Sequence, residues 1–140
     1  MNVILVAVDG SEPSQRAFSL ATDVARRFGA KLRVAYVVSP MVLPPEALGL
    51  TPDKVAAEHR RFAEELVREA TAPAVAAGVS VEPLILHGNP AEQIAQAALA
   101  TDVDLVVVGT SGRAALARVI LGSTTDRLVH VSHKPVLVVP

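Results

Sequence analysis

The sequence predicts a single α/β domain over residues 1–140, with a doubly wound five-stranded parallel sheet in the order 3-2-1-4-5 and helices on both faces. Short apolar runs rich in β-branched residues alternate with longer segments whose apolar residues recur at helical spacing. Such alternation is typical of parallel strands joined by right-handed crossovers. Hydrophobic residues make up 51% of the chain and aromatic residues only 3%, so Val, Leu, Ile and Ala must fill the core, as they do in buried parallel sheets.

The first half of the chain is divided by glycine and proline. Gly29 is a natural helix end, and the four prolines between Ser39 and Pro52 disfavour regular structure there. We expect, in order, a strand at Val3–Val8, a helix at about 12–28, a strand at Leu32–Val38, an irregular loop at Ser39–Pro52, and a helix from Thr51 or Pro52 to about Ala77. Pro73 is predicted to kink or shorten this last helix.

The second half repeats the alternation. Asn89-Pro90 is typical of a helix N-cap followed by proline in the first turn. We expect a strand at Val79–Leu86, a helix from Pro90 to about Ala100, a strand at Asp104–Val108, a partly irregular glycine-bounded segment at Gly109–Leu121, a helix from Gly122 to about Val131, and a strand at Val136–Val139.

Composition excludes several classes of function. The net charge is −1, which disfavours general electrostatic capture of nucleic acid. The chain has no cysteine, which excludes disulfides, thiolate catalysis and cysteine metal sites. The apolar start lacks a basic segment and a cleavage site, so it predicts a strand rather than a signal peptide. No run reaches the ~18 apolar residues of a membrane span. We therefore expect a cytoplasmic protein that does not bind membranes.

Two unusual segments are predicted to meet where the strand order reverses, between the first and fourth strands. These are Ala7–Ser11 and Val108–Gly112. Ligands of doubly wound sheets bind beyond the carboxyl ends of the strands at this point. Gly109 and Gly112 allow the backbone to turn sharply and to approach a ligand without a Cβ.

Gly122-Ser123-Thr124 is predicted to open a helix whose free N–H groups and dipole can hold a phosphate. The hydroxyls of Ser123, Thr124 and Thr125 add donors, and Arg113 and Arg118 could offset phosphate charge. The alternative is a glycine-rich surface loop followed by an ordinary serine N-cap, and spacing alone does not decide between the two readings.

Three stretches carry a resemblance to a known family: ILVAVDGS at the start, HGNPAEQI in the middle, and VVVGTSGRAALARVILGSTTDRLVHVSHKPVLVV near the end. Together the chain resembles the universal stress protein family over essentially its whole length. The third stretch is similar to the family's G-2X-G-9X-G-[S/T] nucleotide motif, with Gly109, Gly112, Gly122 and Ser123 in register. Because these glycines are kept, the chain resembles the branch that binds ATP.

The resemblance implies an adenine nucleotide alpha hydrolase-like fold and a site for ATP, with or without Mg²⁺. It places Ala7, Asp9 and Val37 near the adenosine, although ATP-binding relatives often have proline at the position of Ala7. It assigns Val108, Gly109 and Gly112 to the ribose and phosphate path. The phosphates themselves would be held by Gly122, Ser123, Thr124 and Thr125.

Asp9 has two interpretations. Its carboxylate could accept from the adenine amino group or a ribose hydroxyl, or reach a metal on the phosphates. It could instead cap the first helix. Its place at the switch point favours the site role.

No metal site built from histidines is expected. The four histidines do not have the spacing of metal ligands: His59, His87, His130 and His133.

The last strand predicts an oligomer. Val136–Val139 is an apolar edge that a monomer would have to protect, and Pro135 suits entry into an edge strand. In the universal stress protein family, which the chain resembles, the strand equivalent to Val136–Val139 commonly pairs with its mate in a second subunit. Both arguments favour a homodimer; no protein partner can be named from the sequence.

Other nucleotide and phosphate folds fit less well. A receiver domain needs an acidic pair and a lysine that are missing, a flavodoxin needs aromatic side chains at the switch point, and neither a P-loop nor a GxGxxG motif is present. Three functions stay open: an ATP-binding regulatory module for stress responses, a slow ATPase or autophosphorylating enzyme, and a dimerisation scaffold. The binding module is favoured, because the chain offers a phosphate cradle without an evident catalytic base.

Overall fold

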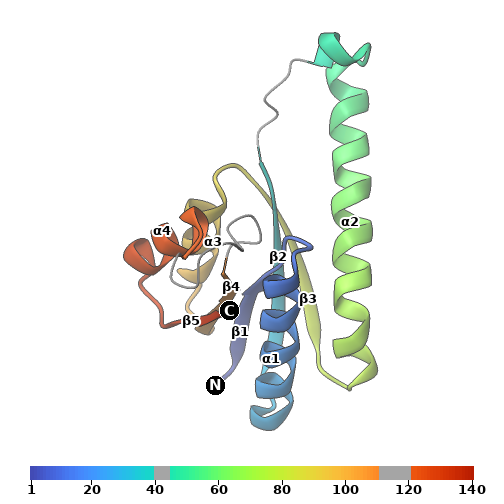
Figure 1. The fold of residues 1–140 in the computed structure, drawn as a ribbon. Coiled ribbons are helices and arrows are strands. Elements are labelled where there is room, and N and C mark those ends of the chain that lie inside the picture. The colour runs from blue at the N-terminus through green and yellow to red at the C-terminus, as the bar shows by residue number, and fades with distance from the viewer. Residues whose placement is uncertain (40–44, 111–120) are drawn as a thin grey trace.

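A computed structural model describes residues 1–39, 45–110 and 121–140. It contains a five-stranded parallel sheet in the order β3-β2-β1-β4-β5, which confirms the predicted order (Figure 1). The strands are β1 (Val3–Ala7), β2 (Lys31–Val38), β3 (Val81–His87), β4 (Val103–Gly109) and β5 (Val136–Val139).

Helices cover both faces of the sheet. They are α1 (Glu12–Phe28), α2 (Pro52–Ala76), α3 (Pro90–Ala98) and α4 (Ser123–Val131), and a short 3-10 helix, η1 (Pro45–Leu48), precedes α2. In Figure 1 the upper part of α2 stands away from the sheet together with η1. No helix among the described residues combines the length and the apolar character needed to cross a bilayer.

The central strand β1 separates two apolar cores. Ile4 and Val6 pack on the face covered by α1 and the end of α2. Leu5 packs on the other face, with residues of α3 and α4. All three side chains are fully buried. Strand β1 is apolar along its whole length because a parallel sheet that helices cover on both sides has no solvent-exposed face.

Local capping signals place most helix ends as predicted. The Ser11 hydroxyl accepts from the Ser14 N–H at 3.3 Å and starts α1, and Gly29, with φ 64°, ends it in the left-handed region. Asn89 starts α3 by accepting from the Glu92 N–H at 3.2 Å. Side-chain oxygens at these positions satisfy N–H groups that the helix itself leaves free.

Other boundaries differ from the predictions. Helix α2 continues through Pro73 to Ala76, so the expected shortening at this proline is wrong. Pro73 lies in the last turn, where the Ala77 N–H still donates to its carbonyl at 3.0 Å. Val79 precedes β3 rather than starting it, because its N–H donates back to Ala74 O in the helix end.

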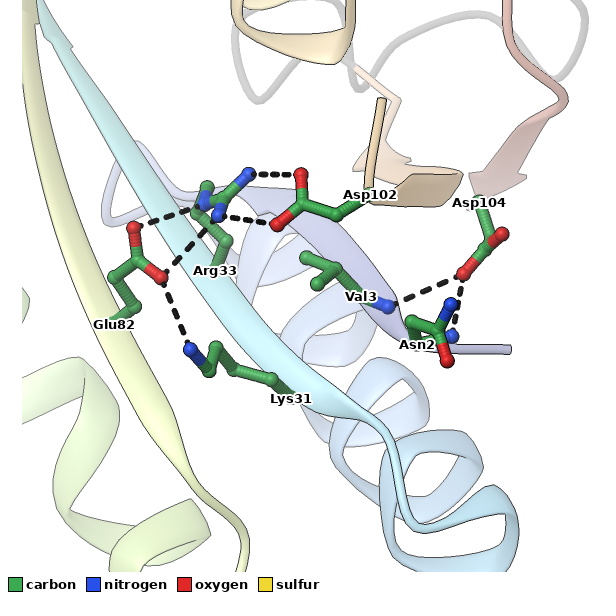
Figure 2. A network of polar contacts seen from close by, with 7 residues as sticks. All are labelled: Asn2, Val3, Lys31, Arg33, Glu82, Asp102 and Asp104. Carbon is green, nitrogen blue, oxygen red and sulfur yellow. Dashed lines mark hydrogen bonds and ion pairs between the residues drawn. The ribbon is translucent and has the colours of Figure 1, made fainter. Parts of the chain in front are cut away.

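An ionic network joins the strands at the amino-terminal end of the sheet (Figure 2). The Arg33 guanidinium on β2 donates to Glu82 on β3 (Nε–Oε1, 3.1 Å) and to Asp102 before β4 (Nη2–Oδ2, 3.0 Å). Lys31 Nζ lies 3.6 Å from Glu82 Oε2. Hydrogen bonds from Arg33 lower the pKa of both carboxyls.

A neighbouring contact ties β1 to β4. The Asp104 carboxylate accepts from the backbone N–H groups of Asn2 and Val3, the latter at 3.2 Å. These backbone donors lower the pKa of Asp104. The amino ends of β1, β2, β3 and β4 are therefore linked by polar contacts between residues far apart in sequence.

Candidate functional site

The reversal of strand order lies between β1 and β4, as expected. Ala7 ends β1 and Gly109 ends β4 at the same edge of the sheet. Ala7 and Val37 lie half-buried against the core on the α3/α4 face, to which the buried Val108 also belongs. The three aliphatic residues assigned to the nucleoside and its ribose path thus share one face of the sheet.

Asp9 follows β1 and is exposed. Its Oδ1 accepts from the Ser11 N–H at 2.9 Å, and its own N–H donates to Ser14 Oγ at 3.0 Å. Because Ser11 is the N-cap of α1, the helix-capping interpretation of Asp9 is wrong. The Asp9 carboxylate instead holds the turn before the helix, in the manner of an Asx turn.

Tyr36 on β2 is close enough to Asp9 for their charges to interact. Burial raises the pKa of the Tyr36 hydroxyl, and the negative charge of Asp9 raises it further. Tyr36 was not among the predicted site residues. Tyr36 packs against the core on the α1/α2 face, opposite to Val37, so it does not join the aliphatic residues assigned to the nucleoside.

Gly109 has a structural role that the sequence analysis missed. A Cβ on this residue would lie 2.5 Å from the carbonyl carbon of Pro13 and 2.6 Å from the Ser14 nitrogen. No side chain fits there, because real Cβ contacts do not come this close. Gly109 therefore lets the backbone of β4 pass directly against the start of α1.

The start of α4 presents the predicted phosphate-binding residues. Gly122 is the buried N-cap, Ser123 is exposed, Thr124 is half-buried and Thr125 is buried. As glycine has no side chain, Gly122 cannot cap the first-turn N–H groups that a helix leaves free. The helix therefore begins with backbone donors and an exposed serine hydroxyl, a combination suited to an anion.

One hydrogen bond fixes α4 to the switch point. Thr125 Oγ1 donates to the Gly109 carbonyl oxygen at 2.8 Å. This bond joins the third residue of the Gly122-capped helix to the last residue of β4. Gly112, Arg113 and Arg118, which were predicted to belong to the same site, lie outside the described residues.

Metal ligands do not gather in the described part of the chain. Within residues 1–39, 45–110 and 121–140, no three His, Asp or Glu side chains converge on a common point. His130 Nδ1 lies 2.7 Å from the Asp126 carbonyl within α4, and His87 ends β3. The described residues place the glycine-capped start of α4 next to the end of β4, and Ala7, Val37 and Val108 on one face of the sheet.

Comparisons with known proteins agree on one family. The sequence model of the universal stress protein family matches residues 1–140. A universal stress protein from Thermus aquaticus is 38% identical over 136 residues, which cover 97% of this chain and 96% of the relative.

Solved structures agree as well. The universal stress protein UspA from Lactobacillus plantarum superposes with a TM-score of 0.84 at 28% identity, over 99% of this chain and 97% of that one. A universal stress protein in complex with cAMP superposes with a TM-score of 0.76 at 27% identity, over 99% and 97% of the two chains.

Proposed function

The chain belongs to the universal stress protein family, and from that premise we propose that it binds an adenine nucleotide, ATP foremost, at the carboxyl ends of β1 and β4. The observation that carries the proposal is the glycine-capped start of α4, which the Thr125–Gly109 hydrogen bond anchors at the switch point. A relative that shares 27% of its residues holds cAMP, which supports adenine as the base.

The proposed binding mode assigns a part to each described residue. The first-turn N–H groups of α4 and the Ser123 hydroxyl receive the phosphates. Ala7, Val37 and Val108 provide the apolar shelf for the nucleoside. Asp9 accepts from a ribose or adenine donor, or reaches a Mg²⁺ ion on the phosphates. Gly112 would complete the motif Gly109-xx-Gly112-x9-Gly122-Ser123.

We assign the nucleotide a regulatory role rather than a catalytic one. The site supplies donors for phosphate, whereas phosphoryl transfer also needs a positioned nucleophile and charge to stabilise the transition state. Nucleotide occupancy would then report on the cell's adenylate state during stress. A turnover assay with Mg²⁺ and ATP separates this role from a slow ATPase: steady release of phosphate that stops in Asp9→Ala would favour the enzyme.

The sharpest binding test uses two substitutions at one exposed position. Ser123→Glu places a negative charge where the phosphates would lie, and the same charge is favourable to the helix dipole of α4. Ser123→Gln has nearly the same shape without the charge.

In calorimetric titrations of the parent protein with ATP, AMP, cAMP and GTP, we expect the adenine nucleotides to bind and GTP not to bind.

We expect Ser123→Glu to weaken ATP binding by about tenfold or more, which corresponds to roughly 1.4 kcal/mol. Ser123→Gln should bind ATP nearly as the parent protein does, and neither variant should melt below the parent protein. Equal ATP affinity in the two variants would place the phosphates elsewhere. If no nucleotide binds to the parent protein, the motif is structural and the scaffold interpretation takes over.

We also propose a homodimer through β5. This strand lies at the edge of the sheet and pairs only with β4 among the described strands. The carbonyls of Pro135 and Val139 point to β4. Because backbone groups alternate along a strand, those of Val136 and Val138 point outward, toward a second copy.

Val138→Pro tests this pairing, since it removes one outward N–H while the groups that face β4 keep theirs. We expect sedimentation to shift toward the monomer, whereas Val138→Ala keeps the dimer. A monomeric parent protein, or an unchanged sedimentation profile in Val138→Pro, would refute edge pairing.

A further inference from the structure

A groove of about 470 Å³ lies between α1 and α2, next to the end of β1. Its apolar lining consists of Val8, Phe18, Leu66, Ala70 and Pro73. Gly10 lies beside Leu66, since a Cβ on Gly10 would be 3.7 Å from Leu66 Cδ1. The groove therefore ends where α2 meets the turn between β1 and α1.

The apolar lining of the groove and the aliphatic residues of the proposed nucleotide site lie on opposite faces of the sheet. Val8 and Phe18 belong to the core on the α1/α2 face, and Leu66 packs against that core. Ala7, Val37 and Val108, assigned to the nucleoside and its ribose path, pack on the α3/α4 face. Among the described residues the two regions meet at the β1–α1 turn, where Gly10 and Ser14 line the groove and the Asp9 N–H donates to Ser14 Oγ.

The chemistry of the lining selects a class of ligand. Glu69 is the one charged side chain among the lining residues that the structure describes, and Ser14, Gln15 and Ser19 add polar groups. Small-molecule sites are typically concavities of about 300–1,000 Å³ with a mostly apolar lining and a few placed polar groups. A carboxylate at such a site attracts a cation and repels a phosphate.

We propose that this groove is a second ligand site, which takes a small molecule with an apolar body and a single ammonium group. The apolar body lies against Phe18 and Leu66, and the ammonium group faces Glu69. The proposal does not depend on nucleotide binding, because none of the aliphatic or α4 residues of the proposed nucleotide site lines the groove.

The test is a titration of the ¹⁵N-labelled protein with 4-phenylbutylamine, followed through its backbone amide resonances. We expect saturable shifts at residues of both walls, namely Gly10, Ser14, Ser19, Leu66 and Ala70. The neutral analogue 4-phenylbutanol should bind at the same residues but more weakly. Shifts that do not saturate, or that fall on other parts of the sheet, would overturn the proposal.

Glu69→Gln tests the charge. Because Glu69 is exposed, the substitution should weaken binding of the amine by about two- to fivefold, the range expected for an exposed ion pair, and leave binding of the alcohol unchanged. The matched control is Glu65→Gln, one helical turn earlier on α2 and outside the lining. An equal effect of the two substitutions on amine binding would exclude the assigned role of Glu69.

Ser19→Phe and Ala70→Phe test the cavity from its two walls. Either substitution should fill the groove and remove binding of both probes, and a dispersed amide spectrum would show that each variant is folded. If both folded variants bind 4-phenylbutylamine as the parent protein does, the ligand lies elsewhere. Binding should also persist in saturating ATP; complete displacement by ATP would show that the two sites are one.

Discussion

Ion pairs link the strands at the amino ends of the sheet, where Asp104 also accepts from backbone N–H groups, whereas at the carboxyl ends the side chains of Asp9 and Thr125 bind backbone groups. Arg33 pairs with both Glu82 and Asp102, and Lys31 pairs with Glu82. The Asp9 carboxylate instead accepts from the Ser11 N–H, and the Thr125 hydroxyl donates to the Gly109 carbonyl oxygen. The first arrangement links strands to one another, and the second fixes the turn before α1 and the start of α4, where we propose that the nucleotide binds.

This contrast separates the ion pairs from the end of the sheet at which we propose that the nucleotide binds. Ligands of open α/β sheets bind at the carboxyl ends of the strands, so charges at the other end are free to pair with one another. Substitutions at the amino end should therefore alter the free energy of unfolding and leave ligand binding alone. Gly109 is the exception, because it serves packing at the binding end.

The largest effect is expected for Gly109→Ala. Its methyl group would meet the Pro13 backbone at 2.5 Å, and this overpacking should lower the free energy of unfolding by about 3 kcal/mol. Urea denaturation measures the loss. Gly78→Ala is the control, because its Cβ has open space and only its φ of 80° is unfavourable, a left-handed conformation that costs alanine about 1–2 kcal/mol. A smaller loss at Gly109 than at Gly78 would contradict the assigned contact.

Arg33→Met should come second. The Arg33 side chain is only 12% exposed and links Glu82 to Asp102, so its removal should cost about 1 kcal/mol of stability, near the upper end for partly exposed ion pairs. ATP affinity should not change. Arg26→Met, which removes an exposed pair with Asp23 within α1, should have almost no effect. Equal losses in the two variants would show that the network adds nothing.

The stabilising effect of Arg33 should disappear in acid. The pKa values of Glu82 and Asp102 are lowered in the folded protein, so their stabilisation is fully present above the unfolded carboxyl pKa of about 4. It is lost as the pH falls through the lowered pKa values. The difference in unfolding free energy between the parent protein and Arg33→Met should thus be constant near neutrality and shrink toward about pH 3. A difference that grows in acid would reverse this sign.

Asp9→Asn should have the smallest effect on stability, within about 0.5 kcal/mol. The amide oxygen of asparagine can still accept from the Ser11 N–H, so the turn before α1 is kept. Affinity for ATP in the presence of Mg²⁺ should nevertheless fall, because the negative charge is gone. Thermal melting and calorimetry measure the two effects. Loss of stability without loss of affinity would make Asp9 a purely structural residue.

The sequence predicted what depends on neighbours along the chain. Gly29 and Asn89 marked helix ends because capping involves atoms only a few residues apart. The alternation of apolar runs led to the parallel sheet with helices on both faces, since connection rules leave few alternatives. The glycine motif from Gly109 to Ser123 indicated the family, which the match over residues 1–140 confirmed.

The tertiary structure decided what depends on atoms distant in sequence. Arg33 lies 49 residues from Glu82 and 69 from Asp102, so their pairing follows from strand register, which no local pattern encodes. Gly109 looked like a position for a ligand, but the fold brings the Pro13 backbone against it. Thr125 similarly shows a free hydroxyl in sequence and a bond to Gly109 in the fold. Sequence periodicity determined which segments become strands and helices. The tertiary structure determined which polar groups bond to one another and which glycines allow close backbone contact, because the distances between segments are set only when the helices pack on the sheet.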